Sequence, residues 1–148
     1  LEFVGIVDGV EYYNDSKGTN VDAVRRALES FPGPVVLLVG GRYKSGDFGI
    51  LAKLMEEKVR MLIVFGEAGE KIKSIIGGIT RTETASNLKD AVRMAHDNST
   101  FGDIVLLSPG CSSFDEFNNY KERGIAFNDM IDRMGSKEDQ GIWTDSLP

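Results

Sequence analysis

Residues 14–20 combine an acid, a lysine and a glycine with asparagine, serine and threonine residues that can cap a helix, at a point where a strand-like pattern gives way to a helical one. In α/β proteins, such a turn between the carboxyl end of a strand and a helix N-terminus offers free backbone N–H groups to an anion. The chemistry indicated is therefore the binding of a phosphate or a carboxylate. Spacing alone equally allows Asp15 and Asn20 to be ordinary turn and cap residues.

Two further loops, 40–47 and 108–115, carry polar residues after apolar runs that are typical of buried strands. If these strands are parallel, all three loops face one crevice outside the carboxyl ends of the strands. Lys17 and Lys44 would then place two cations beside that crevice, where a mobile point charge suits a phosphate or a carboxylate. The alternative is that both are solvated surface lysines, which is the usual situation of this residue.

Other residues of chemical interest have simpler explanations. Ser113 and Glu116 have the spacing of a capping box, which predicts that Ser113 caps a helix over 116–134. Cys111 has no histidine near it in sequence, so we expect it to serve in packing rather than as a nucleophile. His96 is expected to be structural, on a helix away from the three loops.

The elements that must position these loops form an alternating pattern, with an Asp8-Gly9 hairpin near its start. The expected strands are 3–7, 10–13, 35–39, 59–65, 79–84 and 104–107, and the expected helices are 21–30, 48–58, 68–76, 87–97 and 116–134. Such alternation predicts an α/β, doubly wound, mostly parallel sheet of about six strands with an antiparallel N-terminal edge hairpin. Thr19 or Asn20 should cap the first helix, and the inward faces of later helices should include Ile50, Ile75 and Tyr120.

Composition excludes several classes of function. The chain has 148 residues and a net charge of −6, which argues against sequence-independent binding to nucleic acid or to an anionic membrane. Its single cysteine and single histidine rule out an internal disulfide, a thiolate zinc cluster and a histidine-rich metal site, and fit a reducing cytoplasm. We expect one domain over 1–134, followed by a polar tail, 135–148, to which no function is assigned.

Four segments, in this order and spacing, resemble the C-terminal domain of the Mur ligases that add D-glutamate: 14–20, 40–48, 106–115 and 119–124. The resemblance runs from Leu1 to about Met134 and is closer than that to the other Mur ligases or to folylpolyglutamate synthase. The family fold is a Rossmann-like α/β domain, in agreement with the pattern above. Arg42 stands where the family often has an acid.

This resemblance implies part of an ATP-dependent ligase of peptidoglycan synthesis. In the family, ATP converts the carboxylate of UDP-N-acetylmuramoyl-L-alanine into an acyl phosphate, and the D-glutamate amine attacks it to give an amide, ADP and phosphate. ATP and Mg²⁺ are bound mainly by a central domain with a P-loop, which this sequence lacks. A chain that begins directly in a strand is expected to be a piece of a longer protein, and alone it is expected to be inactive.

The resemblance also implies roles for individual residues. Lys17 would be catalytic, facing the phosphates or the acyl phosphate, while Asp15 and Asn20 would belong to the nucleotide site. The residues expected to hold D-glutamate are Thr19, Lys44, Ser113, Phe114 and Tyr120. A diacid suits lysines, hydroxyls and helix N-termini, and transfer to an acyl phosphate needs charge neutralisation and positioning more than a protein nucleophile.

Two other interpretations remain open at this point. The chain would fit a stand-alone α/β ligand-binding or regulatory module without catalysis. A nucleotide-dependent oxidoreductase is disfavoured because neither glycine-rich stretch, 40–49 or 66–78, gives a dinucleotide fingerprint. Under the ligase interpretation we expect a cytoplasmic monomer whose partners are its substrates and the missing domains, with no metal ligands of its own and no contact with nucleic acid or membrane.

Overall fold

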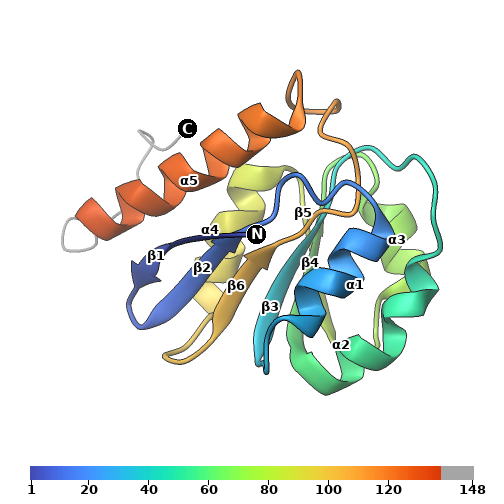
Figure 1. Cartoon of the computed structure of the whole chain (residues 1–148), viewed down its shortest axis with the longest axis horizontal. Coiled ribbons are helices and arrows are strands. Elements are labelled where there is room, and N and C mark those ends of the chain that lie inside the picture. Colours follow the sequence, from blue (N-terminus) through green and yellow to red (C-terminus); the bar gives the residue numbers. More distant parts are fainter. Residues whose placement is uncertain (138–148) are drawn as a thin grey trace.

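A six-stranded sheet forms the centre of the computed structural model, which describes residues 1–137 (Figure 1). In order across the sheet, the strands are β1 (Glu2–Val7), β2 (Val10–Asn14), β6 (Ile104–Leu107), β3 (Val35–Gly40), β4 (Val59–Phe65) and β5 (Arg81–Ala85). β1 runs antiparallel to β2, and every other neighbouring pair is parallel. This confirms the predicted doubly wound sheet with an N-terminal edge hairpin.

Helices cover both faces of the sheet (Figure 1). One face packs against α1 (Val21–Glu29), the 3₁₀ helix η1 (Phe48–Leu51), α2 (Ala52–Lys58) and α3 (Gly69–Ile76). The other face packs against α4 (Leu88–Asn98) and α5 (Tyr120–Lys137). None of the helices within residues 1–137 is long and apolar enough to cross a membrane.

The burial of the strands follows their composition. Every residue of β3 and β6 is buried, as expected for continuous apolar runs with a helix layer on each side. The polar strand β5 lies at an edge of the sheet, as its alternating pattern predicts. At the opposite edge, Asp8 and Gly9 both have positive φ, 52° and 77°, which the tight hairpin between β1 and β2 requires.

Two apolar residues that the sequence places inward are instead exposed. Ile50 is 51% exposed because the segment begins as a 3₁₀ helix, in which residues three apart share a face. Phe48 and Leu51 therefore point into the core and Ile50 does not. Ile75 is 41% exposed, since Ile72 and Ile76, one turn apart, fill the inward face of α3.

The start of α5 also differs from the prediction. The helix begins at Tyr120 rather than at 116, and Tyr120 is 41% exposed instead of lying on the inward face. Its cap is Asn119, whose Oδ1 accepts a hydrogen bond from the Glu122 backbone N–H at 2.9 Å. The predicted capping box of Ser113 is therefore wrong, and the equivalent pattern lies six residues later. At the other end, α5 continues to Lys137, three residues past the expected end, and residues 138–148 of the predicted tail lie outside the described residues.

Glu116, the other half of the predicted capping box, instead caps a different helix. Its carboxylate accepts a hydrogen bond from the Leu88 backbone N–H, at 3.2 Å, in the first turn of α4. Asn87 caps the same helix by accepting from the Asp90 N–H at 2.9 Å. The segment after β6 is therefore tied to α4 before it enters α5.

Replacement of Ile63, fully buried in β4, by alanine should lower the free energy of unfolding by about 2–5 kcal/mol, because it leaves a cavity in the core between the sheet and the layer of α4 and α5. Ile50→Ala is the matched control, and its effect should be within about 0.5 kcal/mol. Urea unfolding followed by circular dichroism measures both changes. Equal losses for the two variants would contradict the described packing.

Candidate functional site

Three loops follow the carboxyl ends of neighbouring parallel strands along one rim of the sheet (Figure 1). We call them the β2 loop (residues 15–20), the β3 loop (residues 41–47) and the β6 loop (residues 108–119). They contain nearly all of the residues that the sequence singles out for chemistry. In an open parallel sheet this rim is where ligands bind.

Backbone hydrogen bonds join the three loops. The Gly110 N–H of the β6 loop donates to the Gly18 carbonyl oxygen of the β2 loop at 2.8 Å. Arg42 and Ser112 exchange two backbone hydrogen bonds, of 3.0 and 3.3 Å, between the β3 and β6 loops. The predicted convergence of the loops is therefore confirmed at the level of the backbone.

Glycine is required where the β3 and β6 loops come closest. Gly41 has φ 128°, and a Cβ at this position would overlap the carbonyl oxygen of Ser112. Any other residue would force the two loops apart. The Gly40-Gly41 pair thus serves close backbone approach within the rim and not a P-loop or a dinucleotide fingerprint.

Arg123, in the first turns of α5, contributes a guanidinium group that is 1% exposed. Its Nε donates to Ser16 Oγ at 3.0 Å and its Nη2 to the Ser16 carbonyl oxygen at 2.6 Å, while Nη1 donates to the Cys111 carbonyl oxygen at 3.0 Å. Burial lowers the pKa of Arg123 to about 10, so the group stays charged at neutral pH. One buried cation therefore holds the β2 loop against the β6 loop.

Arg123 is the main residue that the sequence reasoning missed as a site component. A signal for it was present, because Arg123 lies one helical turn before Phe127 and two turns before Ile131, on the apolar stripe of α5. A charged residue on such a stripe is rarely fully buried unless it is hydrogen-bonded. Its partners, however, come from residues that are distant in sequence.

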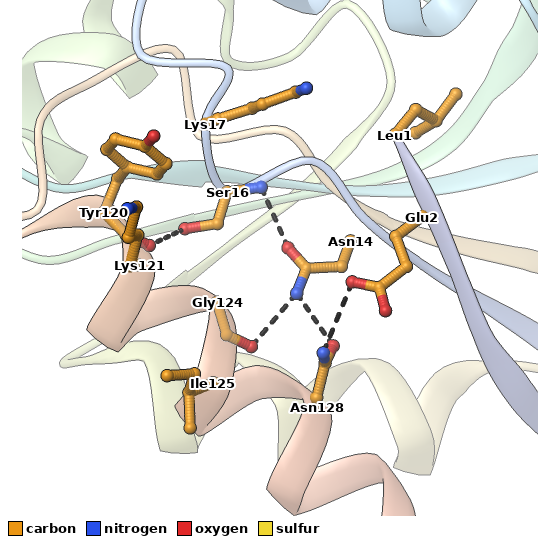
Figure 2. Close-up of a pocket in the computed structure, with 10 residues that line it drawn as sticks. All are labelled: Leu1, Glu2, Asn14, Ser16, Lys17, Tyr120, Lys121, Gly124, Ile125 and Asn128. Carbon is orange, nitrogen blue, oxygen red and sulfur yellow. Dashed lines mark hydrogen bonds between the residues drawn. The ribbon is translucent and has the colours of Figure 1, made fainter.

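A cavity of about 540 Å³ lies between the end of β2 and the first turns of α5, as Figure 2 shows. It is lined by Leu1, Glu2, Asn14, Ser16, Lys17, Tyr120, Lys121, Gly124, Ile125 and Asn128. Asn14 organises its floor: the side-chain Nδ2 donates to the Gly124 carbonyl oxygen at 3.0 Å and to Asn128 Oδ1 at 2.7 Å. Lys17 and Lys121 give this cavity two positive charges.

A smaller cavity of about 340 Å³ lies on the α1 side of the β2 loop. The predicted nucleotide residues Asp15 and Asn20 both line it, together with the predicted catalytic Lys17, which lines both cavities. Asp15 is buried and accepts a hydrogen bond from Ser108 Oγ at 2.9 Å. Asn20 is the N-cap of α1, accepting from the Ala23 N–H at 2.9 Å, so its predicted capping role is confirmed.

The residues expected to hold D-glutamate are dispersed along the rim. Tyr120 lines the larger cavity, whereas Thr19, Lys44, Ser113 and Phe114 line neither of the two. Ser113 is 2% exposed, and its Oγ has no hydrogen-bond partner within residues 1–137. In the same part of the chain, neither the Lys17 nor the Lys44 ammonium has an ion-pair partner. The loops are brought together, and these polar groups remain available to a ligand.

The remaining candidates have structural surroundings. Arg42, which stands where the family often has an acid, forms an exposed ion pair with Glu67 at 3.3 Å. His96 lies on α4, its Nε2 3.6 Å from Asp8 at the hairpin turn and thus at the opposite end of the sheet from the loops. Residues 1–137 contain no group of three or more His, Cys, Asp or Glu side chains that could hold a metal ion.

Comparison with known proteins gives matches over most of the chain. The family "Mur ligase, glutamate ligase domain" matches residues 1–111. The UDP-N-acetylmuramoylalanine–D-glutamate ligase of Syntrophus aciditrophicus is 50% identical over 131 residues, and that of Aquifex aeolicus is 45% identical over 133 residues. These alignments cover 88% and 89% of this chain but only 29% and 32% of the relatives, so the chain spans about a third of their length.

Solved structures show the same fold at low sequence identity. A murein peptide ligase from Psychrobacter arcticus superimposes with a TM-score of 0.55 at 12% identity, covering 86% of this chain and 29% of that chain. A domain of a UDP-N-acetylmuramate:L-alanyl-γ-D-glutamyl-meso-diaminopimelate ligase from Haemophilus ducreyi gives 0.51 at 14% identity, covering 74% and 87% of the two chains. At such identities the likeness concerns the fold alone.

Cys111 is buried in the core beside the rim, which confirms its predicted packing role. Burial raises the pKa of its thiol from 9.0 to about 12. A thiolate-selective reagent at pH 8 should therefore label the folded chain slowly and the urea-unfolded chain rapidly. The stability that comes from keeping this thiol neutral is present below pH 9.0 and is lost as the pH rises towards 12.

Ellman's reagent measures the labelling rate without ambiguity, since the chain has a single cysteine. Rapid stoichiometric labelling of the folded chain would contradict the described burial of Cys111.

Proposed function

The chain belongs to the Mur ligase family, glutamate ligase domain, and from this we propose that it is the C-terminal, D-glutamate-binding domain of an ATP-dependent ligase. That ligase adds D-glutamate to UDP-N-acetylmuramoyl-L-alanine in peptidoglycan synthesis, the activity named for the relatives. The observation that carries the proposal is the joining of three polar loops at one rim, where Lys17 and Lys44 have no ion-pair partner within residues 1–137.

On the D-glutamate side of the rim, Thr19, Lys44 and Ser113 hold the two carboxylates. The buried Ser113 hydroxyl, which has no hydrogen-bond partner in the described part of the chain, supports this assignment, because such a group costs free energy that a ligand can recover. Lys44 supplies a mobile positive charge from the β3 loop. Tyr120 and Phe114, both largely exposed, provide ring surface beside the carboxylates.

On the phosphate side, Lys17, Asp15 and Asn20 act together at the start of α1. The positive end of the helix and the Lys17 ammonium both favour the negative charge of phosphate oxygens. Transfer of phosphate to the muramoyl-alanine carboxylate gives an acyl phosphate and ADP, and attack by the D-glutamate amine then gives the amide and phosphate. Lys17 lowers the repulsion between these anions by neutralising their charge.

The rest of the ligase completes this site. The sequence has no P-loop, and residues 1–137 have no cluster of acidic or histidine ligands for Mg²⁺. The relatives are about three times as long as the aligned segment, which leaves room for the domains that bind ATP, Mg²⁺ and the UDP-sugar. The rim of this chain binds the amine substrate, D-glutamate, and contributes part of the phosphate binding.

Lys44→Ala should weaken D-glutamate binding by about 10- to 100-fold, the loss expected for one charge-assisted hydrogen bond. Titration of the ¹⁵N-labelled chain with D-glutamate should also perturb the amides of Thr19, Lys44 and Ser113. Lys53→Ala, at an exposed lysine of α2, is the matched control and should leave the affinity unchanged. Unchanged affinity after Lys44→Ala, or no perturbation of the three amides at saturation, would show that D-glutamate does not bind at this rim.

The 148-residue chain by itself should make no amide and release no phosphate from ATP, because the proposed P-loop and metal site lie elsewhere. The measurement is a phosphate-release assay with ATP, Mg²⁺, UDP-N-acetylmuramoyl-L-alanine and D-glutamate. A longer chain that includes the missing domains serves as the positive control. Turnover by the short chain would overturn the proposed division of labour.

A further inference from the structure

Within residues 1–137, the buried guanidinium of Arg123 donates hydrogen bonds only to neutral oxygens. Its three hydrogen bonds go to the side-chain and main-chain oxygens of Ser16 and to the main-chain oxygen of Cys111. A charge that leaves water loses hydration free energy, and neutral acceptors replace only part of it. The lowered pKa of Arg123 reflects this loss. Stability alone therefore does not explain an arginine here, since an apolar side chain of similar volume often stabilises a protein at least as much when it replaces a buried charge.

The two partners of Arg123 are adjacent to residues with proposed roles. Ser16 directly precedes Lys17 on the phosphate side, and Cys111 lies two residues before Ser113 on the D-glutamate side. The start of α5 makes a further hydrogen bond to the same residue, because Ser16 Oγ donates to the Tyr120 carbonyl oxygen at 2.7 Å. The planar guanidinium thus spans the gap between the two halves of the rim.

The β3 loop passes close to the same group. A Cβ added at Gly41 would lie only 3.3 Å from Arg123 Nη1, so a side chain at this position would crowd the guanidinium. Lys44 follows three residues later in this loop. Arg123 is therefore hydrogen-bonded to the β2 and β6 loops and lies beside the β3 loop.

We propose that Arg123 is a positioning residue that fixes the spacing between Lys17, Lys44 and Ser113, so that anion binding at the rim depends on its hydrogen-bond geometry. It touches no substrate and acts through Ser16, Cys111 and Gly41. The ligand named in the test below rests on the proposed function, whereas the hydrogen bonds themselves do not. A lysine at this position would keep the charge but could not reach both loops, because its donors radiate from one nitrogen.

The test compares Arg123→Lys with Arg133→Lys in the 148-residue chain. Arg133 lies on the same helix, is partly exposed and pairs with Asp129 at 3.2 Å, so it is a matched control for the same substitution. At a temperature where each variant is folded by circular dichroism, D-glutamate affinity should fall at least about tenfold for Arg123→Lys and stay unchanged for Arg133→Lys. A folded Arg123→Lys chain with the affinity of the parent would overturn the proposal, because a merely structural arginine changes stability and not the affinity of the folded chain.

A second variant covers the case in which Arg123→Lys does not fold. Ser16→Ala removes the acceptor for Nε and the donor to the Tyr120 carbonyl, but leaves the Ser16 main-chain oxygen and the helix packing in place. It should weaken D-glutamate binding in the same direction and by a smaller factor. Unchanged affinity after Ser16→Ala would then count as the overturning result.

Amide chemical shifts of the ligand-free chain separate this proposal from the proposed function. If the parent chain binds no D-glutamate, the proposed function fails, and the shifts alone decide the role of Arg123. In the folded Arg123→Lys chain, or in Ser16→Ala if the former does not fold, amides in all three loops should move together while those of β3 and β4 stay in place. Loop amides that remain at the parent positions would show that the spacing does not depend on this residue.

Discussion

The arrangement of the rim depends on a positive charge held out of water. Inside a protein, hydrogen bonds to a charged donor are stronger than those between neutral groups, and an unsatisfied donor is correspondingly costly. The Arg123 guanidinium meets this condition with three short bonds to two loops. Movement of one loop away from the other would leave at least one N–H group of this buried charge without its acceptor. Because the local dielectric constant is low, these few hydrogen bonds strongly restrain the distance between the β2 and β6 loops.

The sheet provides the rigid base that such a restraint needs. β3, β4 and β6 lie between two helix layers, and their apolar side chains are almost entirely excluded from solvent. Parallel neighbours bring their carboxyl ends to one rim, and Gly41 lets the β6 loop approach the end of β3. The polar side chains of the rim thus lie in the loops, at the end of β2 and in the first turns of α5, outside the apolar core. The sheet fixes where each loop begins. The Arg123 guanidinium fixes how far the loops lie from one another.

Sequence patterns predicted the fold well where local and tertiary preferences agree. The continuous apolar strands, the Asp8-Gly9 turn and the cap Asn20 are each specified by a few adjacent residues. The start of α5 was predicted wrongly because two nearby segments, at Ser113 and at Asn119, carry similar capping signals. Only tertiary contacts decide between them: Glu116 is drawn to the first turn of α4. The apolar stripe of α5 signals that Arg123 is buried, but its partners could not be predicted, because two of its three acceptors are main-chain oxygens, which any residue type supplies.

The exposure of the two lysines explains why a fixed rim is still an incomplete site. Two charges about 4 Å apart in bulk water interact by only about 1 kcal/mol, and by several times more where solvent is excluded. Lys17 and Lys44 are both exposed on a chain of net charge −6, so neither exclusion of water nor overall charge strengthens their attraction for an anion. Geometry can be set by this domain alone, through its buried arginine. Strong binding also requires another surface that covers the rim and removes its water, which is the physical reason to divide such a site between domains.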